Sequence, residues 1–158
     1  RQIEVKCFGG FDLFVDGRSV VFPRSKAKEL LACLVDRRGN WVSRLDAFST
    51  LWEDRCYDKP AQKYFDNVAR CMLDTLEENG ISDIVEKRRG ALRIRPETIH
   101  CDFYGFLDGD LDLIYAFRGE YMNDYSWASV TEAFADSVKT RKIEQASIEN
   151  VEDTHVTF

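Results

Sequence analysis

The sequence predicts an α+β fold: an N-terminal antiparallel sheet, three helices, a β-hairpin and then a short all-α extension. Apolar residues that alternate with polar ones near the start of the chain indicate strands. Apolar residues at spacings of three and four between residues 26 and 78 indicate helices. The charge balance changes near residue 99, where 18 basic and 16 acidic residues give way to 4 basic and 12 acidic. We therefore predict two domains, 1–99 and 100–150, and a tail of residues 151–158.

Composition indicates a packed protein without a secretory or membrane-spanning segment. Hydrophobic residues make up 44% of the 158 residues, and aromatic residues 13%, which is typical of a globular chain. No apolar run approaches the roughly 20 residues that span a bilayer, so we expect a cytoplasmic protein with no membrane partner. We expect no disulfide, metal or other cofactor, because the cysteines are odd in number and form no Cys-x-x-Cys pair. They are Cys7, Cys33, Cys56, Cys71 and Cys101.

Residues 3 to 22 predict three short antiparallel strands. Apolar residues occupy alternate positions in two runs separated by Gly9-Gly10: Ile3, Val5, Cys7 and Phe11, Leu13, Val15. Asp16-Gly17 is a two-residue hairpin turn that leads to a third strand. So small a sheet must pack one face on the helices that follow.

Two helices follow, over residues 26–38 and from residue 44 to about Leu51. Ser25 is the expected cap of the first helix, and Ser43 with Asp46 resembles a capping box at the start of the second. Residues 53–59 then form a connector to the third helix.

The third helix, over residues 61–78, is the most regular in the chain. Pro60 suits its first turn, and Asn79-Gly80 supplies a left-handed stop. Opposite its apolar stripe lies a polar face that consists of Gln62, Lys63, Asp66, Asn67, Arg70 and Asp74. Exposure to solvent accounts for these polar residues as well as ligand binding does. The segments before and after the helix must therefore distinguish the two interpretations.

The hairpin that follows is the most basic stretch of the protein. Residues 86–95 hold five basic side chains against one acidic one, and the bases are Lys87, Arg88, Arg89, Arg93 and Arg95. A solvated turn explains one or two arginines but not five bases in ten residues, so we favour contact with phosphates.

Beyond Cys101 the pattern is helical. Asp102 and Asp110 are expected to cap two short helices, and a last helix begins near Ser126. The spacing of the aromatic residues matches packing between helices, so we expect them in the core. The helical period fades beyond Arg141, and we expect residues 151–158 to fray.

Three strands, three helices and a basic terminal hairpin, in this order, make a winged helix-turn-helix with a leading sheet. The third helix of such a fold presents its polar face to the major groove of DNA. The hairpin is a wing on the neighbouring backbone or minor groove. The sequence thus predicts double-stranded DNA as the partner, and no small-molecule substrate.

The chain also resembles a known family. The run IEVKCFGGFDLFVDGRSVVFPRSKAKELLACLVDRRGNWVSR, the later LW, the third helix and the basic hairpin resemble the OmpR-type winged-helix domain of SARP-like transcriptional regulators. HCDFYGFL and RGEYMNDYSWA resemble the start of the bacterial transcriptional activation domain, a TPR-like helical module. The likeness covers about residues 2–130. It implies a sequence-specific DNA-binding regulator, the output part of a signal-responsive two-component (phosphorelay) system, often preceded by a receiver domain.

The resemblance implies roles for particular residues. The recognition helix would contact DNA through Lys63, Asn67 and Arg70, and the wing through Lys87, Arg88, Arg89 and Arg93. The connector takes the place of a loop that touches RNA polymerase in this family, here with Asp54, Arg55, Tyr57 and Asp58. RNA polymerase and a second copy of the chain are the further partners expected.

Two other interpretations remain open. Asp66 and Asp74 lie on the outward face of the third helix and repel phosphate, whereas the family's recognition helix usually carries several bases. The alternative is therefore a winged helix that binds a protein or itself instead of DNA. An enzyme is least favoured, since Gly9-Gly10 precedes no helix and His100 beside Asp102 is a commonplace pairing.

Overall fold

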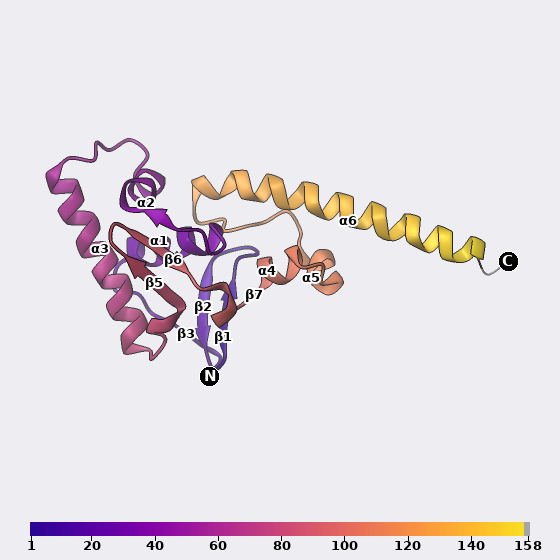
Figure 1. The fold of residues 1–158 in the computed structure, drawn as a ribbon, viewed down its shortest axis with the longest axis horizontal. Coiled ribbons are helices and arrows are strands. Elements are labelled where there is room, and N and C mark those ends of the chain that lie inside the picture. Colours follow the sequence, from indigo (N-terminus) through magenta and orange to yellow (C-terminus); the bar gives the residue numbers. More distant parts are fainter. Residues whose placement is uncertain (157–158) are drawn as a thin grey trace.

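The N-terminal sheet has four strands, one more than the sequence indicates (Figure 1). The computed structural model describes the backbone of residues 1–156 and the side chains of residues 1–151. Strands β1 (Ile3–Lys6), β2 (Asp12–Val15) and β3 (Arg18–Ser19) form the predicted antiparallel meander. Strand β7 (His100–Cys101) lies parallel to β1 at the edge of the sheet. The segment near the expected domain boundary is thus part of the first sheet.

Local chemistry accounts for the meander. Ile3 and Val5 are buried while Glu4 and Lys6 are exposed, so the alternation in the sequence places one face of β1 on the core. Asp16 and Gly17 have φ of 50° and 85°, the pair of left-handed residues that a tight type I′ turn requires.

Three helices pack together behind this sheet. Helix α1 (Ser25–Asp36) is central, since it contacts both α2 (Arg44–Leu51) and α3 (Lys59–Glu78) and buries Leu30, Leu31 and Leu34 completely. The predicted cap at Ser25 is wrong: Ser25 is the first helical residue, and Arg24 precedes it without a capping side-chain bond. Packing on three sides stabilises α1 without that cap.

The starts of α2 and α3 are capped as their sequences suggest. Ser43 accepts a hydrogen bond from the Asp46 N–H at 3.1 Å, as the expected capping box requires. Asp58 accepts one from the Ala61 N–H at 3.0 Å, with Pro60 in the first turn. Helix α3 therefore begins at Lys59, two residues before the predicted start.

The predicted hairpin forms, and it belongs to a second sheet. Strands β5 (Val85–Arg88) and β6 (Ala91–Ile94) are antiparallel, and β4 (Val42–Ser43) adds to β6 in the order β4-β6-β5. Gly90, with φ of 76°, allows the tight turn between β5 and β6. The α+β winged-helix prediction is confirmed.

The helical extension packs back on the first part of the chain through α1. It comprises α4 (Asp102–Leu107), α5 (Leu111–Ala116) and α6 (Ser129–Val156). The Tyr121 hydroxyl donates to Asp36 at 2.7 Å, and the Trp127 indole N–H donates to Glu29 at 2.9 Å. The aromatic residues lie in the core as predicted, with Phe103, Phe106, Phe117 and Tyr121 fully buried.

Helix α6 is longer than its sequence pattern indicates, and its far end projects from the body of the molecule (Figure 1). It runs to Val156, through most of the tail that we expected to fray, and residues 157–158 lie outside the described residues. The fading apolar period did not end it, because no glycine or proline occurs from residue 129 to residue 156. None of the helices among the described residues combines the length and the hydrophobicity that spanning a bilayer requires.

Asp102 joins the extension to β1. The prediction that it caps a helix is wrong, because Asp102 is the first residue of α4 and Cys101 precedes it without a capping side-chain bond. Its carboxylate accepts a hydrogen bond from the adjacent Phe103 N–H at 2.7 Å. It also accepts the N–H groups of Cys7 and Phe8, at 2.8 and 3.0 Å, just beyond the end of β1. Burial raises the pKa of Asp102, and these backbone bonds partly offset the rise.

Asp102→Ala should destabilise the protein by about 1–3 kcal/mol, because part-buried N–H groups lose their acceptor. Urea unfolding measures the change. Asp108→Ala is the matched control, since Asp108 is exposed and makes no side-chain hydrogen bond or ion pair with the described residues. Equal stabilities of the two variants would contradict the role given to Asp102.

Candidate nucleic-acid interface

Arg44, at the start of α2, connects the hairpin turn to the outward face of α3. Its backbone N–H donates to the Gly90 carbonyl at 3.1 Å. Its guanidinium forms an ion pair with Asp66 on α3. The tip of the wing and the polar face of α3 are therefore neighbours on one surface.

The predicted contact residues of α3 form a single exposed stripe. Lys63, Asn67 and Arg70 are all exposed and follow the i, i+4, i+7 spacing of one helical face. At 1.5 Å per residue this stripe spans about 10 Å, close to the length of three base pairs. The ion pair with Arg44 offsets the repulsion that Asp66 would exert on phosphate. Asp74, also exposed, has no such partner among the described residues.

The five basic residues of the hairpin divide into two sets. Arg93 and Arg95 both pair with Glu86, at 2.5 and 3.3 Å, and the hydrogen bond from Arg93 lowers the pKa of Glu86. Arg93 is half-buried and held within the hairpin, so its contact with DNA stays a prediction. Lys87, Arg88 and Arg89 are exposed, and no described carboxylate pairs with them.

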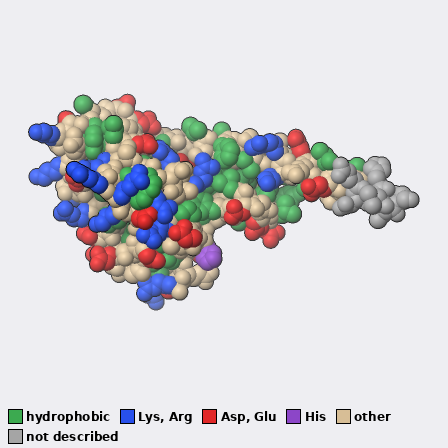
Figure 2. Space-filling model, in the orientation of Figure 1, with side chains coloured by type: hydrophobic (Ala, Val, Ile, Leu, Met, Phe, Trp, Pro, Cys, Tyr) green, Lys and Arg blue, Asp and Glu red, His purple; other side chains and the backbone are tan. Residues whose placement is uncertain are grey.

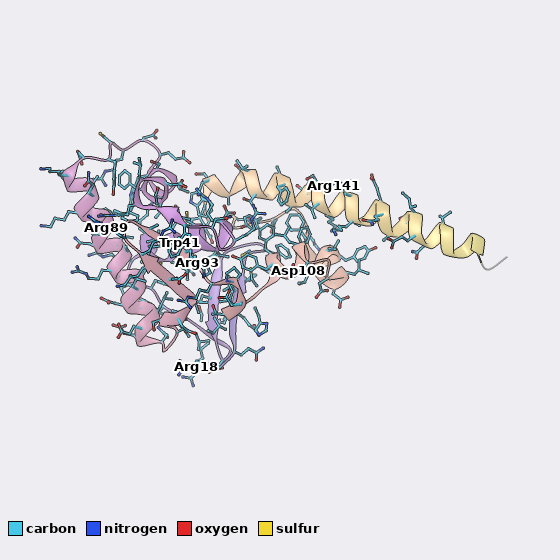
Figure 3. All side chains as sticks on the ribbon, viewed as in Figure 1. Arg18, Trp41, Arg89, Arg93, Asp108 and Arg141 are labelled. Atoms are coloured by element: carbon cyan, nitrogen blue, oxygen red, sulfur yellow. The ribbon has the colours of Figure 1, made fainter. Side chains whose placement is uncertain are left out.

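An aromatic residue that the sequence did not single out lies on the same surface. The Arg88 guanidinium lies 4.2 Å from the centre of the Trp41 ring system, and that of Arg93 lies 5.5 Å from it. Figure 3 shows Trp41 and Arg93 together and also labels Arg89, which lies in the turn of the hairpin. The position of Trp41 just before a strand gives no local sign that it contacts an arginine, because the contact depends on the pairing of β4 with β6.

Arg24 is a further residue that sequence reasoning missed. It lines a shallow groove between the start of α1 and α3, together with Asn67 and Arg70. An isolated arginine before a helix is too common to single out. Lys and Arg side chains gather over α3 and the hairpin in Figure 2, whereas Asp and Glu gather near α4 and α5.

The four residues of the α2–α3 connector that were predicted to contact RNA polymerase have different surroundings. Tyr57 packs against Phe48, with ring centres 4.9 Å apart, and Asp58 caps α3. Asp54 and Arg55 are exposed, and Arg55 lies 5.6 Å from the Tyr64 ring. The structure thus gives Tyr57 and Asp58 a role in folding, while Asp54, Arg55 and Asp58 are exposed.

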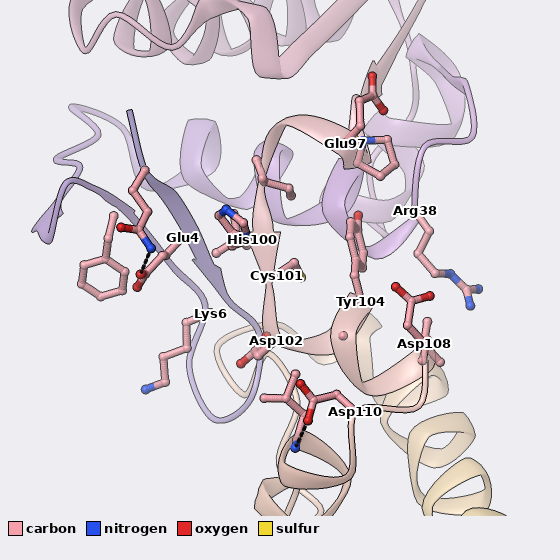
Figure 4. Close-up of a pocket in the computed structure, with 18 residues that line it drawn as sticks. Glu4, Lys6, Arg38, Glu97, His100, Cys101, Asp102, Tyr104, Asp108 and Asp110 are labelled. Atoms are coloured by element: carbon pink, nitrogen blue, oxygen red, sulfur yellow. Dashed lines mark hydrogen bonds between the residues drawn. The ribbon is translucent and has the colours of Figure 1, made fainter.

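A second groove lies away from this basic surface. It has a volume of about 980 Å³ and runs between β1, β7 and the α4–α5 region (Figure 4). Its acidic rim, Glu4, Glu97, Asp108 and Asp110, makes it unsuitable for a polyanion. His100 and Asp102 both line it, but Asp102 binds backbone N–H groups, so the two do not act as a base and its orienting partner.

One group of possible metal ligands also borders this groove. Donor atoms of Cys7, Cys101 and Asp102 lie within 4.8 Å of one another, and the two sulfurs are 3.6 Å apart. The Asp102 carboxylate already accepts three backbone hydrogen bonds, and burial raises the pKa of the Cys7 thiol. Packing and backbone bonding account for this group, and we assign no metal to it.

Comparison with known proteins shows the fold. No protein-family model matches the chain, and none of the curated proteins matches it. The structure is similar to that of Mycobacterium tuberculosis EmbR in complex with a low affinity phosphopeptide, with a TM-score of 0.60 and 18% sequence identity. The match covers 93% of this chain and 43% of the EmbR chain. The shared fold is an N-terminal sheet, a winged helix and C-terminal helices.

Arg93→Gln should raise the pKa of Glu86 toward the ordinary glutamate value, because the largest cause of its lowered pKa is the hydrogen bond from Arg93. NMR titration of the Glu86 carboxyl carbon measures this shift. A lowered folded-state pKa means that the pairing stabilises the hairpin above the ordinary glutamate pKa and is lost as the pH falls through the lowered value. Lys87→Gln is the control, and an equal shift in both variants would contradict the pairing.

Proposed function

We propose that this protein is a sequence-specific, DNA-binding transcriptional regulator of the OmpR-type, SARP-like class. Helix α3 enters the major groove, and the β5–β6 hairpin lies on the adjacent backbone. The observation that carries this proposal is the link from Gly90 through Arg44 to Asp66, which joins the two basic elements into one surface. The likeness to EmbR supports the fold on which the proposal depends.

The charges on this surface suit a polyanion. Seven basic residues on or beside it are exposed and have no carboxylate partner among the described residues: Arg24, Lys59, Lys63, Arg70, Lys87, Arg88 and Arg89. The acids Asp74, Glu77 and Glu78 lie toward the C-terminal end of α3. Repulsion from phosphates at that end favours insertion of the N-terminal half of α3 into the groove.

Two residues on the stripe are suited to read base edges. The Asn67 amide matches the N6 and N7 atoms of adenine, and the Arg70 guanidinium matches the O6 and N7 atoms of guanine. Both line the shallow groove beside Arg24, which Asp74 and Glu78 also line. We therefore assign Arg24 to offsetting these two carboxylates beside the bases that Asn67 and Arg70 read.

The same proposal gives the connector and the extension roles in regulation. Asp54 and Arg55 are the exposed connector residues to which we assign the contact with RNA polymerase. The helical extension packs on α1 and leaves the basic surface uncovered. A signal received elsewhere would act on DNA binding or polymerase contact through these parts, as in output domains of two-component systems.

Binding to duplexes selected from a random pool should weaken with salt. If most of the seven free cations each neutralise one phosphate, the slope of log K against log salt should be about −4 to −6. Fluorescence anisotropy at several salt concentrations measures it. A flat response would contradict the proposal.

Charge reversal should separate positioning contacts from base reading. Arg88→Glu with Arg89→Glu should weaken binding to all duplexes at least ten-fold, because attraction to phosphate becomes repulsion. Asn67→Ala should reduce discrimination at one or two base pairs by about 1–3 kcal/mol. Arg18→Glu is the matched control for the single variant Arg89→Glu, because it reverses one charge and Arg18 is exposed near the β2–β3 turn, away from both elements (Figure 3). Equal losses for Arg18→Glu would show that net charge, and not this surface, controls binding.

Self-association is a second candidate function, favoured by the outer face of α6. Exposed residues follow spacings of four and three along it: Val130, Phe134, Ser137, Arg141, Glu144, Ile148 and Val151. Val130 is 78% exposed and Ile148 is 59% exposed. This is the heptad stripe of a coiled coil, apolar at both ends and polar in the middle.

The heptad stripe of α6 fits the same stripe on a second copy of the chain. In an antiparallel pair centred near Arg141, Val130 lies opposite Val151 of the partner subunit, and Phe134 lies opposite Ile148 of the partner subunit. The two Arg141 side chains then face each other at the centre, and each lies about one helical turn from Glu144 of the partner subunit, so that the carboxylates offset the repulsion between the arginines. This self-complementarity favours a homodimer over an unrelated partner.

Ile148→Asp should convert a dimer into a monomer, because it puts a charge into the apolar contact. Sedimentation velocity at about 100 μM protein measures the state, a concentration at which a micromolar dimer is mostly assembled. Ser147→Asp adds the same charge at an exposed position outside the stripe and should leave the dimer intact. A monomeric wild type at this concentration would contradict self-association through α6.

A further inference from the structure

We infer that Trp41 is a positioning residue of the wing, which holds the Arg88 guanidinium in the orientation that DNA binding uses. The inference rests on the proposed function and extends it to a residue that lies outside both the recognition helix and the hairpin. It starts from the stack between the Trp41 indole and Arg88.

Strand pairing puts the two side chains on one face. Val42 pairs with Leu92, and Ser43 pairs with Ala91, so Trp41 falls level with Arg93 at the start of β4. In the hairpin, Arg88 pairs with Ala91, and Glu86 pairs with Arg93. Because side chains alternate along a strand, Arg88, Arg93 and Trp41 share a face, while Lys87 points to the other side.

Arg93 and Arg88 meet the indole differently. Arg93 is fixed by Glu86 at 2.5 Å and reaches the Gly39 carbonyl at 3.5 Å, so two of its three nitrogens already donate within the protein. Arg88 makes no hydrogen bond or ion pair with the described residues; its charge helps to lower the pKa of Glu86, and its guanidinium lies over the indole face. Arg88 is therefore the arginine of this stack whose donors remain available.

Stacking leaves the useful part of the guanidinium free. A guanidinium that lies flat on an aromatic ring keeps its five N–H donors in its own plane, open to phosphate or base acceptors. The 4.2 Å between Arg88 and the centre of the Trp41 ring system is short enough for this arrangement. An arginine ordered before binding loses less side-chain entropy when it meets DNA. Trp41 thus acts through Arg88, since the guanidinium lies over its ring.

A double-mutant cycle tests this role with Trp41→Leu, Arg88→Gln and the double variant. Binding to the selected duplex should weaken about two- to five-fold for Trp41→Leu, the range expected for an exposed cation–π contact. In the Arg88→Gln background, Trp41→Leu should cause no further loss. Trp41→Phe, which keeps an aromatic face, should restore most of the affinity.

Salt dependence separates positioning from charge. Trp41→Leu should leave the slope of log K against log salt unchanged because no charge is removed, whereas Arg88→Gln should reduce its magnitude by about one. Tyr115→Leu on α5 is the control for loss of an exposed aromatic ring, and it should bind as the wild type does.

Several outcomes would overturn the inference. Equal losses for Trp41→Leu in both backgrounds would show a structural role that does not act through Arg88, and an unchanged affinity would show no role. In the free protein, the Arg88 side-chain protons should show an upfield ring-current shift that Trp41→Leu removes; its absence in the wild type would contradict the stack without reference to DNA. A wild type that binds no duplex at any salt would instead refute the proposed function itself.

Discussion

One residue, Arg44, holds together the surface on which this account depends. Its backbone binds the turn of the hairpin, and its side chain binds the middle of α3. The side chains of this ion pair are 42% and 52% exposed, so it adds little to global stability. Its importance is geometric: it fixes two elements from different parts of the chain relative to each other, and it neutralises the carboxylate that would oppose phosphate.

The rest of the structure keeps this surface positive and uncovered. The acidic extension is held on α1 by Tyr121 and Trp127, whose hydrogen bonds end on Asp36 and Glu29. Within the hairpin, Glu86 pairs with both Arg93 and Arg95, and the Arg88 guanidinium lies over Trp41. The charged groups thus separate into a rigid internal set and an exposed set. The net charge of −6 keeps non-specific attraction to DNA low. Binding then depends on the local positive potential and the shape of the surface formed by α3 and the hairpin.

The sequence predicted the parts of the fold that local patterns determine. Helix α3, the Asp16-Gly17 turn and the hairpin around Gly90 all follow from residue spacing and turn chemistry. Strand β7 was missed because two residues carry no periodic signal, and only its pairing with β1 makes it a strand. The end of α6 was misplaced because a polar helix that leaves the core has no apolar period to read.

At the candidate site, the sequence indicated which residues are basic but not which of them are free of carboxylate partners. The pairs Arg44–Asp66 and Arg93–Glu86 arise from tertiary and cross-strand contacts.

The most direct test of the central claim is a map of amide chemical shifts as a selected duplex is added to the labelled protein. If α3 and the hairpin form one binding surface, the amides around Asn67 and Arg70 should shift together with those of Arg89 and Gly90, at the same DNA concentration. Shifts confined to only one of these elements, or centred on α6 or the acidic groove, would contradict the account.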